Sequence, residues 1–88
     1  MPFTITRYEA TPNPNALKCW LDRPISETPR SFLNAEMAGE DPLAATLFDE
    51  AGLTCLLLNG EWMTINKPAD ADWNAVKKRV EAVLSRTA

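Results

Sequence analysis

Few residues of this chain could carry out covalent chemistry. The 88 residues include no histidine, and the two cysteines, Cys19 and Cys55, do not form a CxxC motif. Without histidine, neither a Ser-His-Asp triad nor a Cys-His pair can be built, and the zinc sites that use histidine are excluded. No other residue pattern pairs a nucleophile with a base. We therefore predict that the protein is not an enzyme and has no catalytic residues.

The two cysteines are expected to be small buried residues of strands, since free cysteine is among the most buried residue types. They are expected to be free thiols, as is usual in a reducing compartment. An alternative is that a dimer binds iron or a cluster directly through Cys19 and Cys55, because cluster sites usually take four thiolates and one chain supplies two. We predict that this domain alone binds no metal and no cofactor.

A loop rich in proline and asparagine is the first candidate binding site. Thr11-Pro12-Asn13-Pro14-Asn15 must be a turn or loop, and it is followed by Lys18. Loops held on a rigid sheet are common recognition sites, so Asn13, Asn15 and Lys18 could contact a partner. The alternative is that proline and asparagine serve only the path of the backbone.

The second candidate is a set of aromatic and polar strand residues, expected on the sheet face that the helices leave open: Trp62, Thr64, Asn66 and Lys67, with Trp20 and Lys18. Tryptophan is enriched at the energetic centres of protein interfaces. The alternative is that one tryptophan lies in the core and the other covers a sheet edge. The predicted partner-binding residues are Asn13, Asn15, Lys18, Trp20, Trp62, Thr64, Asn66 and Lys67. A small-ligand or phosphopeptide site that uses Lys18, Lys67 and the asparagines is a further alternative.

Overall charge and hydropathy narrow the class of partner. The net charge is −3 and the pI about 4.8, whereas domains that bind nucleic acid are usually strongly basic. No apolar run is long enough for a signal peptide or a membrane span. We expect a cytoplasmic protein that binds neither nucleic acid nor membrane.

Alternating apolar residues predict the strands that must position these side chains. Residues 16–21 and 61–66 have this pattern, residues 3–8 are rich in β-branched and aromatic residues, and residues 53–58 are apolar enough for a central strand. Asn59-Gly60 indicates a hairpin with a type I′ turn. Pro24 and Pro29 favour a loop over residues 22–30, with a short third strand at residues 30–33, while residues 34–40 are ambiguous.

Two helices are predicted by their capping residues and apolar stripes. Asp41-Pro42 begins a helix over residues 42–51, and Gly52 ends it. A second helix begins after Asp70 or Asp72, with Trp73 as its first core residue. The order is β-β-(β)-α-β-β-α. We predict one α+β domain over residues 1–88, in two layers, with a mainly antiparallel sheet of four to five strands and two helices on one face.

Three patches in this order resemble the N-terminal domain of Nfu/NifU-type iron–sulfur scaffold proteins. Residues 9–18, EATPNPNALK, resemble the family opening E-x-T-P-N-P-N-x-[LM]-K-F. Residues 41–48, DPLAATLF, resemble S-P-L-A-x-x-L-F, and residues 62–73 are similar to F-I-T-V-T-K-x-x-x-A-D-W. The resemblance covers nearly the whole chain. It departs at three strand positions, where Cys19, Trp62 and Asn66 replace Phe, Phe and Thr.

The resemblance implies a non-enzymatic accessory or docking role in iron–sulfur cluster assembly, through contacts with assembly proteins or client proteins. In full-length members of the family, a CxxC pair on a separate C-terminal domain holds the cluster. These 88 residues contain no such pair, so the cluster-carrying activity transfers to none of them. An iron–sulfur cluster is therefore associated with this chain only through the family, and the chain is expected to be one half of a two-domain design.

Overall fold

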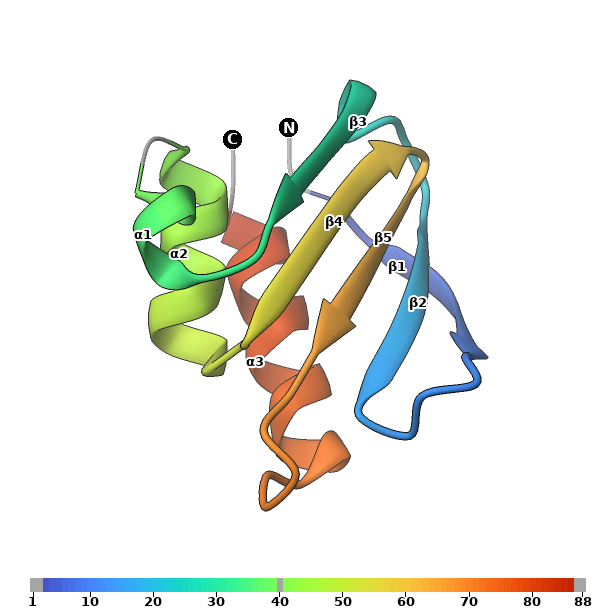
Figure 1. Ribbon diagram of the computed structural model, residues 1–88. Helices are drawn as coiled ribbons and strands as arrows, with labels where there is room; N and C mark the ends of the chain where they lie inside the picture. Colours follow the sequence, from blue (N-terminus) through green and yellow to red (C-terminus); the bar gives the residue numbers. More distant parts are fainter. Residues whose placement is uncertain (1–2, 40, 87–88) are drawn as a thin grey trace.

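The computed structural model describes residues 3–39 and 41–86 of the chain; Met1, Pro2, Glu40, Thr87 and Ala88, which the predicted domain included, lie outside the described residues. The strands are β1 (Ile5–Ala10), β2 (Ala16–Leu21), β3 (Ser26–Phe32), β4 (Cys55–Gly60) and β5 (Trp62–Asn66). They form an antiparallel sheet in the order β1-β2-β5-β4-β3 (Figure 1).

Three helices accompany the sheet: α1 (Ala35–Ala38), α2 (Pro42–Ala51) and α3 (Trp73–Arg86). Figure 1 shows α2 and α3 side by side on one side of the sheet, so the other face is left uncovered. The α+β class, the two layers and the antiparallel sheet are confirmed. The described part of the chain has three helices rather than two, because the ambiguous segment forms α1.

The hydrophobic core lies between the helices and one face of the sheet. Leu47 of α2 and Val80 of α3 are fully buried, as are Met63 and Ile65 of β5. Each buried leucine, valine or isoleucine side chain stabilises the fold by about 1.5–3 kcal/mol relative to exposure. Successive strand residues point to opposite faces, so the residues between these core positions must point to the uncovered face.

Helix α2 begins and ends where its sequence predicts. Asp41 Oδ1 accepts hydrogen bonds from Leu43 N at 2.9 Å and Ala44 N at 3.2 Å, which satisfies two backbone donors at the N-terminus. Gly52 ends the helix with a φ of 68°, a left-handed conformation that glycine adopts without strain. For α3, Asp72 is the residue that caps the first turn, with Ala75 N donating to its Oδ2 at 3.3 Å.

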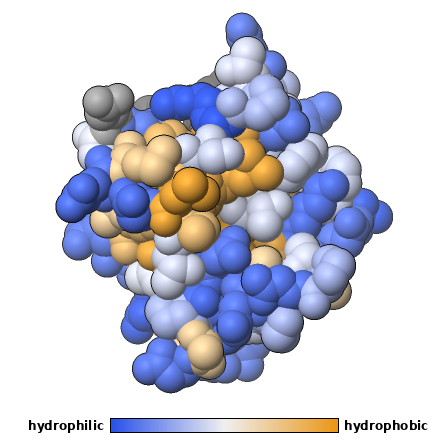
Figure 2. All heavy atoms as spheres, in the orientation of Figure 1, coloured by the Kyte–Doolittle hydropathy of each residue, from blue (hydrophilic) through white to orange (hydrophobic). Residues whose placement is uncertain are grey.

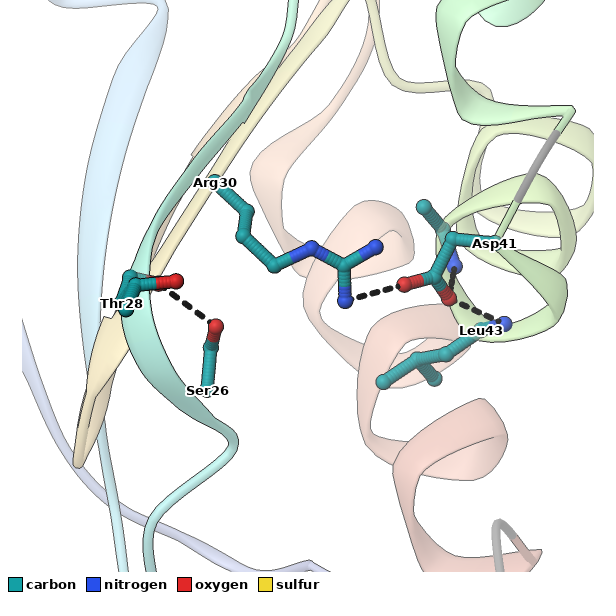
Figure 3. Close-up of polar contacts among 6 residues, drawn as sticks. Ser26, Thr28, Arg30, Asp41 and Leu43 are labelled. Atoms are coloured by element: carbon teal, nitrogen blue, oxygen red, sulfur yellow. Dashed lines mark hydrogen bonds and ion pairs between the residues drawn. The ribbon is translucent and has the colours of Figure 1, made fainter.

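The predicted loop over residues 22–30 is wrong, since most of it belongs to β3. Proline cannot donate to a sheet ladder, but β3 is an edge strand, where Pro29 is tolerated. The pairing with β4 is interrupted between Ser26 and Arg30, and Ser26 Oγ donates to Thr28 O at 2.6 Å there. Arg30 then reaches Asp41 across the gap to α2, with Nη1 and Oδ2 2.7 Å apart (Figure 3).

The hairpin between β4 and β5 forms, but its turn differs from the predicted one. Asn59 pairs with Trp62, so the two central residues are Gly60 and Glu61. Gly60 has a φ of 58°, and no non-glycine residue of the described chain has a positive φ. A positive φ at the first central position alone is the pattern of a type II′ turn, not type I′. The turn therefore needs Gly60 and makes no such demand of Asn59.

Strand β1 contains an irregularity that decides which of its side chains face the core. Its pairing with β2 shifts between Ile5 and Arg7. Ile5 and Tyr8 both pack against the core as a result, although alternation from Ile5 would have placed Arg7 there. Tyr8 donates a hydrogen bond from its hydroxyl to Glu81 of α3. Arg7 and Glu9, the two charged residues of this strand, lie on the side away from the core, beside Trp20.

Candidate functional site: the uncovered face of the sheet

The uncovered face brings together residues from two central strands. In the pairing of β2 with β5, Trp20 lies opposite Trp62 and Lys18 opposite Thr64. Directly opposed residues on one face have Cβ atoms about 5 Å apart. Asn66 lies on the same face, at the end of β5 beside Ala16. Five of the eight predicted site residues, namely Lys18, Trp20, Trp62, Thr64 and Asn66, therefore share this face, and all five are partly exposed.

Lys18 lies between the two tryptophan rings. Its Nζ is 4.3 Å from the centroid of the Trp20 ring and 4.4 Å from that of Trp62. Both distances are within the range of a cation–π interaction, which contributes about 0.5–1 kcal/mol at exposed sites. Arg7 places its Cζ 5.2 Å from the Trp20 centroid as well. We call the four residues Arg7, Lys18, Trp20 and Trp62 the cation–tryptophan cluster.

Glu9 holds one side of this cluster in place. Its Oε1 accepts a hydrogen bond from Trp20 Nε1 at 3.4 Å and lies 3.6 Å from Arg7 Nη2. A shallow hollow beside the cluster, lined by Thr6, Arg7, Trp20, Leu21 and Glu61, gives this end of the face a concave surface. Arg7 and Glu9 were not among the predicted site residues, because simple alternation from Phe3 and Ile5 places both on the core side.

The proline–asparagine loop is held by its own hydrogen bonds. Thr11 Oγ1 lies 2.9 Å from Asn13 O and 3.0 Å from Ala16 O, and Asn15 N donates to Asn13 Oδ1 at 2.9 Å. These are the local side-chain contacts that make asparagine and threonine common in turns. The polar groups therefore support the backbone path, while the side chain of Asn13 remains exposed.

Lys67 does not lie on the uncovered face, and its predicted place there is wrong. It is only 8% exposed, because alternation along β5 directs it, like Met63 and Ile65, toward the helices. Its Nζ donates to Asn15 Oδ1 at 3.1 Å and to Pro68 O at 3.4 Å, and lies 5.4 Å from the centroid of the Trp73 ring. Asn15 and Lys67 thus form a structural contact. Because Lys18 and Lys67 point to opposite sides of the sheet, they cannot converge on one ligand.

The two thiols also lie on opposite faces of the sheet. Cys19 is completely buried beneath the helices, whereas Cys55 pairs with Asn66 on the uncovered face and is partly exposed. Burial raises the pKa of Cys19 to about 12, with the negative charge of Glu81 adding to the rise and Lys77 opposing it. Iron–sulfur clusters are held by thiolates. The two sulfurs of one folded molecule therefore cannot bind the same cluster.

Within residues 3–39 and 41–86, no three His, Cys, Asp or Glu side chains gather where they could hold a metal ion. Nor does any helix of these ranges have the length and apolar character to cross a membrane.

One exposed apolar patch was not predicted. Leu33 is 64% exposed and Met37 44% exposed, at the junction of β3 and α1. Figure 2 shows hydrophobic side chains grouped there. The segment that carries both residues was predicted only as a short strand and an ambiguous stretch, so no periodicity could indicate which of its side chains would be exposed.

Comparison with known proteins decides the family. The family model described as the N-terminal part of the scaffold protein Nfu/NifU matches residues 5–88. The chain belongs to the Nfu/NifU N-terminal family.

Curated relatives of this Nfu/NifU N-terminal domain are longer proteins. The human NFU1 iron-sulfur cluster scaffold homolog, mitochondrial, is 33% identical over 76 residues, which are 84% of this chain and 30% of that protein. A NifU-like protein of Schizosaccharomyces pombe is 33% identical over 81 residues, or 89% of this chain and 31% of that protein. The chain thus spans about three-tenths of the length of the curated relatives it matches.

Solved structures share the fold of this Nfu/NifU N-terminal domain. A NifU-like protein from Saccharomyces cerevisiae superimposes with a TM-score of 0.76 at 24% identity, covering 94% of this chain and 77% of that one. A protein from Staphylococcus aureus gives a TM-score of 0.73 at 23% identity, covering 91% and 96%. Both structures have the fold described above.

Proposed function

We propose that this domain is a non-enzymatic docking module of iron–sulfur cluster assembly that contacts an assembly protein or a client protein with the uncovered face of its sheet. The observation that carries the proposal is the cation–tryptophan cluster, whose two tryptophans, lysine and arginine lie on a face that no helix covers. Tryptophan and arginine are enriched among the residues that dominate binding energy at interfaces.

Membership of the family supports the biological setting. The human relative is named an iron-sulfur cluster scaffold homolog, and the matching family model describes a scaffold protein. The cytoplasmic location stays a prediction, and the human and Arabidopsis thaliana relatives are named mitochondrial.

Direct binding of iron through Cys19 and Cys55 is less well supported. One sulfur is buried under the helices and the other lies on the opposite face, so a dimer would have to unpack its core to bring both to a cluster. After anaerobic reconstitution with iron and sulfide, we expect no visible absorption that depends on these cysteines. Absorption that the variant Cys19→Ala removes would support the thiol site instead.

Site-specific cross-linking tests the docking role. A photoreactive residue replaces Thr64, at the centre of the uncovered face, and a matched probe replaces Lys78, on the outer side of α3. After irradiation in the native host, we expect iron–sulfur assembly or client proteins at position 64, few of them at position 78, and fewer when Trp62→Ala is added. Unrelated proteins only at position 64, or equal capture at position 78, would contradict the proposal.

A further inference from the structure

The ammonium of Lys18 is held in a fixed place but is not neutralised. The two tryptophan rings, 4.3 Å and 4.4 Å from Nζ, are its contacts within the described chain, where it makes no hydrogen bond and no ion pair. Ring faces attract a cation, yet they do not accept the N–H groups as a carboxylate would. Lys18 thus keeps donors for an oxygen that approaches from solvent.

The carboxylate best placed to pair with Lys18 is engaged elsewhere. Glu9 lies directly opposite Lys18 in the pairing of β1 with β2. Its Oε1 is instead directed to Trp20 Nε1 at 3.4 Å and to Arg7 Nη2 at 3.6 Å. The negative charge therefore fixes the Trp20 ring from its edge and leaves the cation over the ring face unpaired.

We propose that the partner binds this cluster with an acidic segment. A Glu or Asp carboxylate of the segment contacts Lys18, and its apolar neighbours contact the rings of Trp20 and Trp62. This inference rests on the proposed docking function. An ammonium already fixed by two rings loses little rotamer freedom on pairing, which lowers the cost of binding. The half-exposed rings supply apolar area on both sides of the charge.

Close to the cluster, the positive charge of Lys18 matters more for an acidic partner than the net negative charge of the whole chain. The net charge of −3 disfavours an acidic partner at long range, but salt screens that repulsion beyond about 8–10 Å. Contact at the cluster is governed by the unpaired ammonium of Lys18, whereas Arg7 is paired with Glu9. The expected partner surface is therefore a short acidic and apolar segment rather than a broad acidic surface.

Titration with a blocked peptide tests the inference without a known partner. The probe is acetylated and amidated Leu-Glu-Leu-Glu-Leu, compared with the matched peptide in which glutamine replaces both glutamates. Binding is followed by the NMR shifts of the indole N–H groups of Trp20 and Trp62, with that of Trp73 as an internal reference, since it donates to Pro14 O at 3.0 Å away from this face. We expect saturable shifts at Trp20 and Trp62 with the glutamate peptide, and at least about fivefold weaker binding of the glutamine peptide.

Two variants of Lys18 separate charge from shape. Lys18→Met keeps an unbranched side chain between the rings and is expected to weaken binding about fivefold, the loss of one partly exposed charge pair. Lys18→Arg is expected to retain binding, and Lys78→Met on the outer side of α3 is the matched control that leaves it unchanged. An unchanged Trp73 signal shows that each variant is folded.

Several results would overturn the inference. In the NMR titration, these are equal shifts with the glutamine peptide, no saturable shift with the glutamate peptide, or wild-type affinity in Lys18→Met. In sedimentation experiments, the contradicting result is association of the free protein with a second copy through this face. The docking function is judged separately by cross-linking from position 64. If cross-linking to assembly proteins is undiminished in Lys18→Met, docking stands and the carboxylate contact is refuted.

Discussion

Lys18 and Lys67 carry the same charge in very different surroundings. Lys18 lies between two rings on the uncovered face, whereas Lys67 is 8% exposed and bonded to Asn15 Oδ1 at 3.1 Å. The ammonium of Lys18 can exchange a water molecule for an oxygen of a partner. The ammonium of Lys67 is instead enclosed by Asn15, Pro68 and the ring of Trp73. The sequence placed both lysines in one binding set because residue type alone does not distinguish these roles.

The two cysteines should differ sharply in reactivity. Cys19 is completely buried, and burial raises its pKa to about 12, while Cys55 is partly exposed. Since the thiolate is the nucleophile, we expect one thiol per native molecule to react with iodoacetamide at pH 8. Mass spectrometry should locate the label on Cys55. Rapid labelling of Cys19 in the native variant Cys55→Ala would contradict this.

The buried thiol should also make the fold sensitive to alkali. Cys19 has a pKa of 9.0 when unperturbed and about 12 in the fold, so above pH 9 the unfolded chain loses a proton that the folded chain keeps. The free energy of unfolding should then fall with rising pH, by up to about 1.4 kcal/mol per pH unit between pH 9 and pH 12.

Urea unfolding between pH 8 and pH 10 measures this slope. Cys19→Ala should flatten it, and Cys55→Ala is the matched control that should not. Tyr8 also lowers the free energy of unfolding as the pH rises above 10, because burial and the hydrogen bond to Glu81 raise the pKa of its hydroxyl in the fold. A wild-type slope in Cys19→Ala would show that another group is responsible.

At the level of single elements, the cap of α2 has a second role. Asp41 accepts from Leu43 N and Ala44 N through Oδ1, and its Oδ2 lies 2.7 Å from Arg30 Nη1 (Figure 3). One carboxylate therefore begins the helix and also holds the edge strand β3 near it. Asp41→Ala should lower the free energy of unfolding by about 1–2 kcal/mol.

Two variants divide that loss between the cap and the ion pair. Asp41→Asn keeps an N-cap acceptor, and Arg30→Met removes only the pair, so each should cost less than about 1 kcal/mol in thermal or urea unfolding. If Asp41→Asn is as damaging as Asp41→Ala, the ion pair and not the cap would be the main contribution.

The elements show what local sequence can and cannot predict. Helix α2 and strand β2 have exactly the predicted bounds, because capping residues and alternation act within a few positions. Only the end of β3 was predicted as a strand, and its first half was predicted as a loop, because only its place at the sheet edge makes Pro29 acceptable. The shift in β1 between Ile5 and Arg7 likewise follows from pairing with β2, so the sequence could not place Arg7 and Glu9 beside Trp20.

Over the whole molecule, a loop on the sheet side is fastened to the helix layer. Trp73 Nε1 donates to Pro14 O at 3.0 Å, and Lys67 links β5 to Asn15. Two residues of the segment 9–18 thus make contacts with positions more than fifty residues away. No local pattern could reveal them, since the contact of Lys67 needs β2 paired with β5 and the contact of Trp73 needs helix α3 placed beside the loop.

Removing the acceptor of Lys67 should therefore destabilise the entire fold. Asn15→Ala leaves a buried ammonium with Pro68 O as its remaining acceptor, which should cost about 1.5–3 kcal/mol. In a double-mutant cycle with Lys67→Met, measured by urea unfolding, the two losses should be less than additive. Asn13→Ala, which removes only the bond from Asn15 N, is the control. Strict additivity would refute the coupling.

The separation of the two layers has a practical consequence for handling the molecule. Helix α3 packs on the covered side of the sheet and extends to Arg86, so an attachment made beyond Arg86 starts from that layer. A chain immobilised there on a sensor surface would present Trp20 and Trp62 outward, whereas coupling through surface lysines would modify Lys18 itself. C-terminal tethering is thus the geometry in which binding measurements can report on this face.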